Sequence, residues 1–399
     1  MSNPPQQRIS RILLGAARAA LTLVVVLVLG LVAARSAQAQ TFSLLYSFTG
    51  LLDGGDPYAT LVRDGAGNLY GTTFYAGKFN AGVVFKVKAA GKETVLFNFP
   101  GGAGGEYPFA GLVRDSAGNL YGTTSGGVGT SNGTVFKVSK PGKQAILHNF
   151  AGGTKDGCAP YGDLLQDAAG NLYGTTQSCG AFGNGTVFKV SKTGKETVLH
   201  SFAGGPKDGA TPVFTGLIMD AKGNLYGITE LGGAFGNGTV YRLSPSGKVT
   251  LLHSFAGGTK DGCDPYGTPA MDKLGNLYGT AVACGTSNVG IVWRVSPTGK
   301  ETVLHNFSGG PSDGALPQAG VIMDANGNLY GDTTGGGSSG DGTVFKVSRT
   351  GKETVLHSFS GPDGKSPQAD LIRDAKGTLY GTTYQGGSVG YGTVWQITK

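Results

Sequence analysis

The chain has 399 residues, of which 73 are glycine, and a formal net charge of +7 at pH 7. Residues 1–40 hold four arginines and no acid, so the rest of the chain has 28 basic and 25 acidic residues, a net charge of +3. This balance is too mild for a nucleic-acid-binding surface, and the basic residues recur along the chain instead of clustering. We expect no nucleic-acid partner.

The first 39 residues have the pattern of a secretory signal peptide. A basic start precedes an uncharged stretch, residues 21–34, and a small-residue cleavage site at residues 37–39. The uncharged stretch ends at Arg35, short of the roughly 20 apolar residues that a membrane-spanning helix needs. The sequence predicts a protein that loses its signal peptide and is secreted or held in the periplasm or cell envelope, where disulfides can form. It predicts no membrane span.

The remaining residues, 40–399, repeat one unit seven times. Its anchor, Asn-Leu-Tyr-Gly or once Thr-Leu-Tyr-Gly, recurs at spacings of 51, 52, 53, 52, 52 and 50 residues. The anchors begin at Asn68, Asn119, Asn171, Asn224, Asn276, Asn328 and Thr378. A period near 50 residues is typical of repeat architectures.

Each unit predicts four short β-strands and no helix. In the third copy the strands are expected at residues 161–166, 171–176, 186–191 and 196–202, which are rich in Val, Leu, Phe, Tyr and Thr. An Asp-x-x-Gly turn joins the first two strands, a Gly-Lys turn joins the last two, and a proline precedes the first. The fold class is therefore all-β.

Seven four-stranded units predict a seven-bladed β-propeller. The last copy stops after its third strand, whereas the mature N-terminus begins with residues 42–48, which match a fourth strand such as 197–202. One N-terminal strand and three C-terminal strands should therefore form blade 7 and close the ring. A β-solenoid would need capping repeats, and none is visible. We expect one domain, residues 40–399, and a monomer.

The four cysteines form two pairs of equal spacing. Cys158 and Cys179, like Cys263 and Cys284, are 21 residues apart, one before the first strand of a unit and one after the second. Antiparallel neighbours bring these positions together, so we expect the disulfides Cys158–Cys179 and Cys263–Cys284. A metal site would need a closed set of Cys and His ligands, and no histidine is near in sequence.

An acidic residue recurs in the loop before the first strand of most units. Hard carboxylate oxygens at such positions are Ca²⁺ ligands, but Asp-Gly is also an ordinary turn pair, and six copies favour the turn interpretation. The candidate Ca²⁺ ligands are Asp53, Asp56, Asp156, Asp208, Asp261, Asp264, Asp313 and Asp363. No other cofactor is expected.

Histidines and aromatic residues recur at fixed positions that favour packing over catalysis. All five histidines lie in the fourth strand of a unit, where the other copies have Phe97 or Tyr46. A flat ring that phenylalanine can replace is not a catalytic base. The third strand holds one large aromatic residue per unit, which we expect between blades.

Function is therefore open between two classes. The loops between second and third strands, and between units, are long and variable, and variable loops on a rigid scaffold are where binding usually occurs. We expect a binding module for an extracellular glycan, protein or cell-envelope component, and no catalytic residues are assigned. The alternative is a metal-dependent hydrolase or lyase in the central channel, which needs unlike acids and amides from different blades to converge on the axis.

The repeat unit resembles a known bacterial family. The motifs Leu-x-x-Asp-x-x-Gly-Asn-Leu-Tyr-Gly-Thr-Thr, Gly-Thr-Val-Phe-Lys-Val and Val-Leu-His-Ser-Phe are similar to the GloVer-type tandem repeat of extracellular proteins, over residues 42–399. The resemblance implies export and often a C-terminal sorting signal, whereas this sequence ends within its seventh unit. It implies no catalytic residues.

Overall fold

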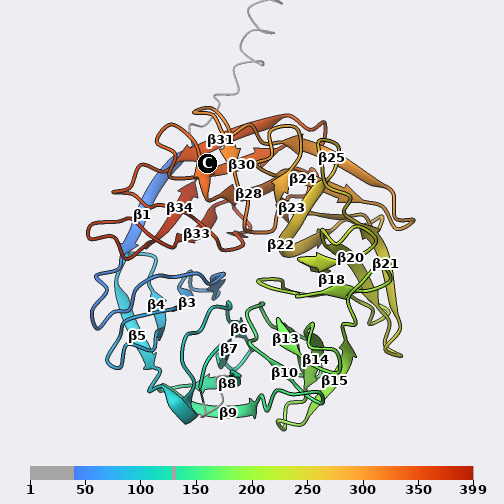
Figure 1. Cartoon of the computed structure of the whole chain (residues 1–399). Coiled ribbons are helices and arrows are strands. Elements are labelled where there is room, and N and C mark those ends of the chain that lie inside the picture. Colours follow the sequence, from blue (N-terminus) through green and yellow to red (C-terminus); the bar gives the residue numbers. More distant parts are fainter. Residues whose placement is uncertain (1–39, 128–131, 399) are drawn as a thin grey trace, which may run out of the picture. The chain divides into compact units, whose positions relative to one another are not determined.

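The computed structural model describes residues 40–127 and 132–398, and the predicted signal peptide, residues 1–39, lies outside them. Residues 42–398 form one compact unit. It contains seven four-stranded antiparallel sheets, which Figure 1 shows as blades around a central axis. The predicted seven-bladed β-propeller is confirmed.

Each blade is a meander of four strands ordered as in the sequence, except in blade 7. From the first to the last strand of each sheet, the blades are β2 (Val62–Arg63), β3 (Leu69–Thr73), β4 (Val83–Val87) and β5 (Glu93–Asn98); β6 (Val113–Arg114), β7 (Leu120–Thr124), β8 (Thr134–Ser139) and β9 (Lys143–Asn149); β11 (Leu165–Gln166), β12 (Leu172–Thr176), β14 (Thr186–Val190) and β15 (Glu196–Ser201); β17 (Ile218–Met219), β18 (Leu225–Thr229), β20 (Thr239–Leu243) and β21 (Val249–Ser254); β22 (Gly262–Met271), β23 (Leu277–Cys284), β24 (Ile291–Val295) and β25 (Glu301–Asn306); β27 (Ile322–Met323), β28 (Leu329–Thr333), β30 (Thr343–Val347) and β31 (Glu353–Ser358); and β32 (Ile372–Arg373), β33 (Leu379–Thr383), β34 (Thr393–Thr398) and β1 (Thr41–Ser47).

Short accessory elements lie in the loops. Three two-stranded ladders pair the loop that enters a blade with the loop after its second strand, and one 3₁₀ turn follows β5. These elements are β10 (Gly157–Cys158) with β13 (Ser178–Cys179), β16 (Gly209–Ala210) with β19 (Leu231–Gly232), β26 (Gly314–Ala315) with β29 (Gly335–Gly336), and η1 (Gly102–Gly104). In the described part of the chain, no helix has the length and hydropathy that a membrane crossing requires.

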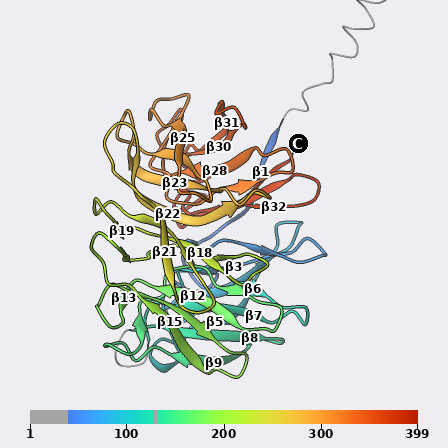
Figure 2. The ribbon, with the colours of Figure 1, turned by 90° about the vertical axis from the view of Figure 1, so that its right-hand side faces the viewer.

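The N-terminal strand closes the ring. Strand β1 pairs with β34, so the sheet order of blade 7 is β1-β34-β33-β32, and Figure 2 shows β1 running beside the C-terminal strands. The backbone N–H of Phe48 donates to the carbonyl oxygen of Gly392 at 3.0 Å. The Phe42 ring stacks on His357 with a centroid distance of 3.8 Å. The predicted closure by one N-terminal and three C-terminal strands is confirmed.

The hydrophobic core lies between neighbouring blades. One cluster joins Val135 and Phe150 of blade 2 to Leu172 and Phe188 of blade 3. The large aromatic residue of each third strand is fully buried, as predicted, and the seven are Phe85, Phe136, Phe188, Tyr241, Trp293, Phe345 and Trp395. Burying an aromatic side chain of this size excludes 150–250 Å² from water, so these residues contribute much of the free energy that holds the blades together.

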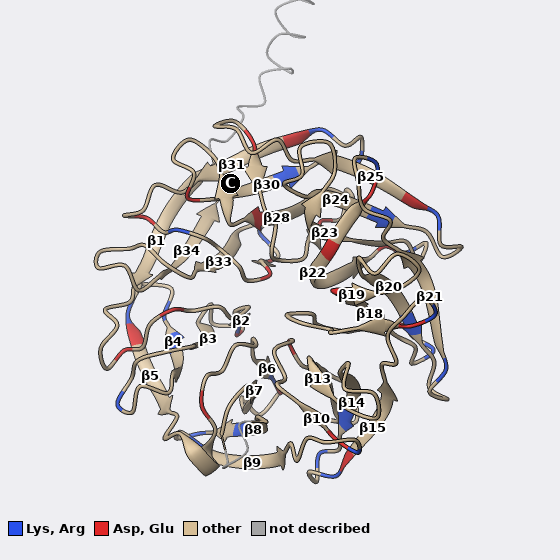
Figure 3. Ribbon diagram, viewed as in Figure 1, with Lys and Arg blue, Asp and Glu red and all other residues tan. Residues whose placement is uncertain are grey.

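The Asp-x-x-Gly turns and both disulfides form as the sequence predicts. In blade 3, the backbone N–H groups of Ala169 and Asn171 donate to Asp167 Oδ1 at 3.0 and 2.8 Å, and the Tyr173 hydroxyl donates to Oδ2 at 3.1 Å. Cys158–Cys179 and Cys263–Cys284 are disulfides with Cα–Cα distances of 5.4 and 5.5 Å. Figure 3 shows the basic residues distributed around the ring and not gathered in one patch.

The innermost strand of most blades is shorter than predicted. In blade 3 the expected strand, residues 161–166, pairs only over Leu165–Gln166. The preceding residues approach the backbone of the next blade instead: a Cβ atom on Gly162 would lie 2.1 Å from the carbonyl oxygen of Thr215. These irregular segments bring one short stretch of each blade to the axis.

Candidate functional site

Seven side chains, one from each blade, converge on one axial cavity. Each follows the proline that enters its blade, by one residue or, in blade 4, by two. They are Tyr58, Phe109, Tyr161, Phe214, Tyr266, Gln318 and Gln368, and all line the same cavity. We call these seven residues the axial mouth. Its residues differ between blades, whereas most repeat positions do not.

The aromatic residues of the axial mouth form a continuous arc. The ring centroids of Tyr58 and Phe109, and of Phe109 and Tyr161, are each 4.9 Å apart. Phe214 follows at 5.3 Å from Tyr161 and Tyr266 at 6.0 Å from Phe214. Beyond Tyr58 the arc continues to Tyr384, which stacks on it at 4.2 Å. Phe214 is 37% exposed and the others are half-buried, so the arc offers aromatic surface to a ligand.

Behind the axial mouth lie two carboxylates from different blades. Asp163 of blade 3 accepts a hydrogen bond from the backbone N–H of Gly111 in blade 2 at 2.5 Å, and another from the Thr60 side chain in blade 1. Asp370 of blade 7 is held in the same way. It accepts from the backbone N–H of Gly320 in blade 6 at 2.6 Å and of Thr268 in blade 5 at 3.1 Å.

Close packing of the blades explains why glycine accompanies these acids. A Cβ atom on Gly320 would lie 2.2 Å from the carbonyl oxygen of Thr268, and one on Gly111 would lie 3.0 Å from Asp163 Oδ1. Glycine at these positions therefore lets the backbones of neighbouring blades approach each other, and at Gly111 it also leaves room for the Asp163 carboxylate.

A third acid, Asp332, is fully buried; its charge interacts with that of Asp370, but it is not among the residues that line the cavity. Neither of its carboxylate oxygens has a hydrogen-bond partner among the described residues. The equivalent residue is Thr280 in blade 5 and Thr382 in blade 7, and their hydroxyls donate to the carbonyl oxygens of Ala319 and Ala59 in the axial segment of the next blade, at 2.6 and 3.5 Å. The same placement directs Asp332 toward the segment that holds Asp370.

The three axial acids resist ionisation. Burial, and then the charge of Asp163, raises the pKa of Asp370 to about 6. Burial also raises the pKa of Asp163, and burial together with the charge of Asp370 raises that of Asp332. Among the described residues, none that lines the cavity is Lys, Arg or His, so none of these side chains offsets the acids.

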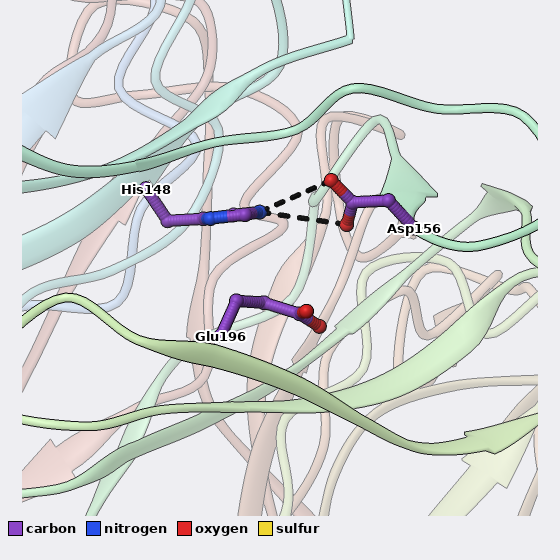
Figure 4. Close-up of side chains that lie close together, drawn as sticks. All are labelled: His148, Asp156 and Glu196. Carbon is purple, nitrogen blue, oxygen red and sulfur yellow. Dashed lines mark hydrogen bonds and ion pairs between the residues drawn. The ribbon is translucent and has the colours of Figure 1, made fainter.

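A second group of polar residues lies at the outer edges between blades. In Figure 4, the His148 ring of one blade faces Asp156, and Glu196 of the next blade points to the same space. His148 Nε2 lies 3.2 Å from Asp156 Oδ2. Burial, and then the charge of Asp156, raises the pKa of Glu196 to about 7, and its Oε1 atom has no partner among the described residues. We call such a cluster an outer seam.

The outer seam recurs with small variations. The charges of equivalent groups interact in the sets Tyr46, Asp53 and Glu93; His253, Asp261 and Glu301; and His305, Asp313 and Glu353. In the described part of the chain, His148, Asp156 and Glu196 are the one group of three whose potential ligand atoms all lie within 4.8 Å of one another. Each histidine also packs edge-on against a phenylalanine, as His148 does on Phe150, which supports the predicted packing role.

The predicted Ca²⁺ ligands fall into two places. Six bond to the turn backbone and to His or Tyr at the outer edges of the blades, four of them within outer seams; the six are Asp53, Asp156, Asp208, Asp261, Asp313 and Asp363. Asp56 and Asp264 instead lie near the axial mouth, where their charges act on Tyr58 and Tyr266. Ca²⁺ binding by these eight residues stays a prediction.

Asp163, Asp332, Asp370 and the axial mouth are not among the site residues that the sequence predicted. The available signal was departure from the repeat: the residue two after the axial-mouth position is Thr60, Gly111, Asp163, Gly216, Thr268, Gly320 or Asp370. Two aspartates and two glutamines from three blades line the axial cavity; whether they serve a channel enzyme stays a prediction.

Comparison with known proteins shows the family to which the chain belongs. The model of the Gloeobacter/Verrucomicrobia repeat matches residues 29–167, 113–273 and 213–399. The chain belongs to this family of repeat propellers. No curated protein matches it.

Solved structures with a similar fold share little sequence. The extracellular domain of a putative one-component system from B. thetaiotaomicron has a TM-score of 0.56 at 11% identity, over 90% of this chain and 40% of that one. The extracellular domain of a putative hybrid two-component system from the same organism has a TM-score of 0.54 at 14% identity, over 90% and 41%. This chain thus spans about two fifths of each. A gluconolactonase from Xanthomonas campestris has a TM-score of 0.43 at 15% identity, over 71% of this chain and 82% of that one.

Proposed function

We propose that the protein is an exported binding module whose axial mouth binds a glycan. The observation that carries the proposal is the arc of aromatic rings from Tyr384 to Tyr266, built from positions at which the repeat departs from its own pattern. A site of this kind combines apolar surface with a few placed polar groups. Gln318 and Gln368 supply amide donors and acceptors beside the arc.

The chemistry of the axial mouth fits a sugar better than a nucleic acid. Sugar rings present C–H faces that pack on aromatic rings, and hydroxyl groups that bond to amides and carboxylates. The described residues of the lining include acids and no Lys or Arg. The acids would repel a phosphate backbone. Two disulfides and the similarity to two extracellular domains agree with a location outside the cytoplasm.

Affinity electrophoresis against a panel of soluble polysaccharides tests this proposal. The variant carrying Tyr161→Ala and Phe214→Ala should bind at least tenfold more weakly than the unmodified chain. The matched control is Phe235→Ala, which removes an aromatic ring that is 61% exposed and lies outside the axial mouth. Equal retardation of both variants would contradict the location, and no retardation by any polysaccharide would contradict the glycan class.

A second candidate function is a hydrolase or lyase in the central channel. Asp163 and Asp370 come from different blades and have raised pKa values, which is typical of acids that move protons. Release of new reducing ends from a bound polysaccharide, abolished by Asp370→Asn, would establish it. Intact polysaccharide after prolonged incubation would leave binding as the function.

A further inference from the structure

We infer that Asp163 and Asp370 together bind one hard divalent cation, Ca²⁺ or Mg²⁺, at the floor of the axial cavity. The inference goes beyond the proposed function, because the cation site would exist whether or not a glycan binds above it. It concerns residues other than the eight aspartates that the sequence suggested.

The two carboxylates are held in position for a shared ligand. They enter the same cavity from blade 3 and blade 7. Backbone N–H groups of preceding blades fix each of them: Gly111 for Asp163, and Gly320 and Thr268 for Asp370. A carboxylate has about four lone-pair positions on its two oxygens, so these bonds orient the groups and leave acceptor capacity for a cation.

The described side chains supply no positive charge to the two carboxylates. No Lys, Arg or His lines the cavity, and buried charges in proteins are otherwise paired, protonated or bound to metals. Asp332 gives an independent indication. It is 0% exposed, both of its oxygens lack a hydrogen-bond partner among the described residues, and its charge interacts with that of Asp370.

The position of Asp332 makes this charge specific to one blade. Five other blades have threonine there, and blade 4 has Ile228, so neither the fold nor blade packing requires an acid. The hydroxyl of each of these five threonines donates to a carbonyl oxygen in the axial segment of the next blade; the donors are Thr72, Thr123, Thr175, Thr280 and Thr382. The acid in their place has no such partner among the described residues, and when ionised its charge interacts with that of Asp370; a cation would favour that ionised form.

The size and chemistry of the cavity select the type of ligand. Its volume is about 40 Å³, and one water needs roughly 10–15 Å³ on this scale. A cation with one or two waters therefore fits, whereas a sugar ring must remain in the axial mouth. The available groups are carboxylate, hydroxyl and amide oxygens, with Thr60 and Thr268 among them. Oxygen ligands of this kind suit Ca²⁺ and Mg²⁺ and not a softer metal.

Isothermal titration of the purified, oxidised chain with Ca²⁺ and with Mg²⁺ at pH 7.5 tests the inference. We expect one ion per chain for at least one of the two metals, with binding at least tenfold weaker in Asp163→Asn and in Asp370→Asn. The matched control is Asp208→Asn, which changes an aspartate paired with His200 at the outer edge of its blade and should bind as the unmodified chain does.

Asp332→Thr is a second test that remains informative if the two asparagine variants do not fold. This substitution restores the residue found in most other blades, and we expect it to lower the affinity for the cation severalfold in a chain that melts normally. Two results would overturn the inference: no heat of binding for either metal, or binding that survives loss of the axial acids and weakens in Asp208→Asn.

Discussion

The carboxylate of Asp370 in blade 7 accepts a hydrogen bond from the backbone N–H of Gly320 in blade 6, with 2.6 Å between Oδ1 and the nitrogen. The same carboxylate reaches Thr268 in blade 5, so one side chain joins three successive blades near the axis. Asp163 does the same for blades 1 to 3. The axial acids therefore contribute to ring closure as well as to charge, and substitutions there should keep an acceptor, as asparagine does.

Asp332→Thr should stabilise the chain when no divalent cation is present. The substitution removes a buried acid without partners and supplies a hydroxyl that can donate to the next blade, as Thr280 does. Relieving an unsatisfied buried group is worth about 1–3 kcal/mol. Thermal unfolding in EDTA should show a higher midpoint for Asp332→Thr than for the unmodified chain. A lower midpoint would mean that Asp332 has a bonding partner in solution.

The outer seams should make the chain less stable as pH rises from 5 to 8. Burial, and then the adjacent aspartate, raises the pKa of Glu93, Glu196, Glu301 and Glu353 from 4.5 to about 7. Between pH 4.5 and about 7, the folded chain therefore binds more protons than the unfolded chain. The stabilisation is complete below pH 4.5 and is lost as pH rises through 7.

Urea unfolding at pH 5 and at pH 8 measures this effect. The glutamates are half-exposed, so after solvent screening we expect a total loss of about 2 kcal/mol across the four seams. Replacing all four glutamates with glutamine should flatten the dependence. Blade 2 already has Gln144 at this position, where its amide donates to the carbonyl oxygen of Gly104 at 2.8 Å. A slope that persists in the quadruple variant would assign the effect to other groups, Asp370 first.

The turn aspartates should govern the acid limit of stability. Although burial acts against it, hydrogen bonds from Asn68, Tyr70 and Ala66 lower the pKa of Asp64 to about 2. This stabilisation is present above the ordinary value of 3.8 and is lost as pH falls toward 2. Asp64→Asn should therefore unfold at a lower urea concentration than the unmodified chain at pH 6, and the two should converge near pH 2. A constant difference across this range would contradict the role of the ionised carboxylate.

Each disulfide should stabilise the chain by about 3 kcal/mol, since each closes a loop with a separation of 21 residues. Serine at Cys158 and Cys179 should lower the denaturant midpoint, and the equivalent pair at Cys263 and Cys284 serves as the internal control. Little change for one pair would show that its sheet already holds the loop ends together. Strands pair directly beside both disulfides, β10 with β13 in blade 3 and β22 with β23 in blade 5.

The scaffold could be predicted because its residues recur in every repeat. The axial mouth could not, because its residues do not recur. Strand count, ring closure, turns and disulfides follow from residues that recur, because each blade meets the same neighbour in the same way. The axial mouth depends on side chains that do not recur, such as Phe214 and Gln318. Whether these face the axis depends on where the innermost strand begins, and in blade 3 that start was predicted at residue 161 instead of Leu165.

The axial acids could not be predicted from the sequence for a different reason. Asp163 and Asp370 are far apart in sequence, and each occupies a position that holds glycine or threonine in the other blades. Their meeting depends on the count of seven blades and on the close approach of backbones at Gly111 and Gly320. A one-dimensional pattern shows the substitutions but not that they share one cavity.

An anomalous difference map from a crystal of the chain grown with Mn²⁺, a stand-in for a hard divalent cation, tests the central claim most directly. We predict one peak at the axis, within bonding distance of Asp163 and Asp370. A peak at His148, Asp156 and Glu196 with none at the axis would contradict this account and move the metal chemistry to the outer seams.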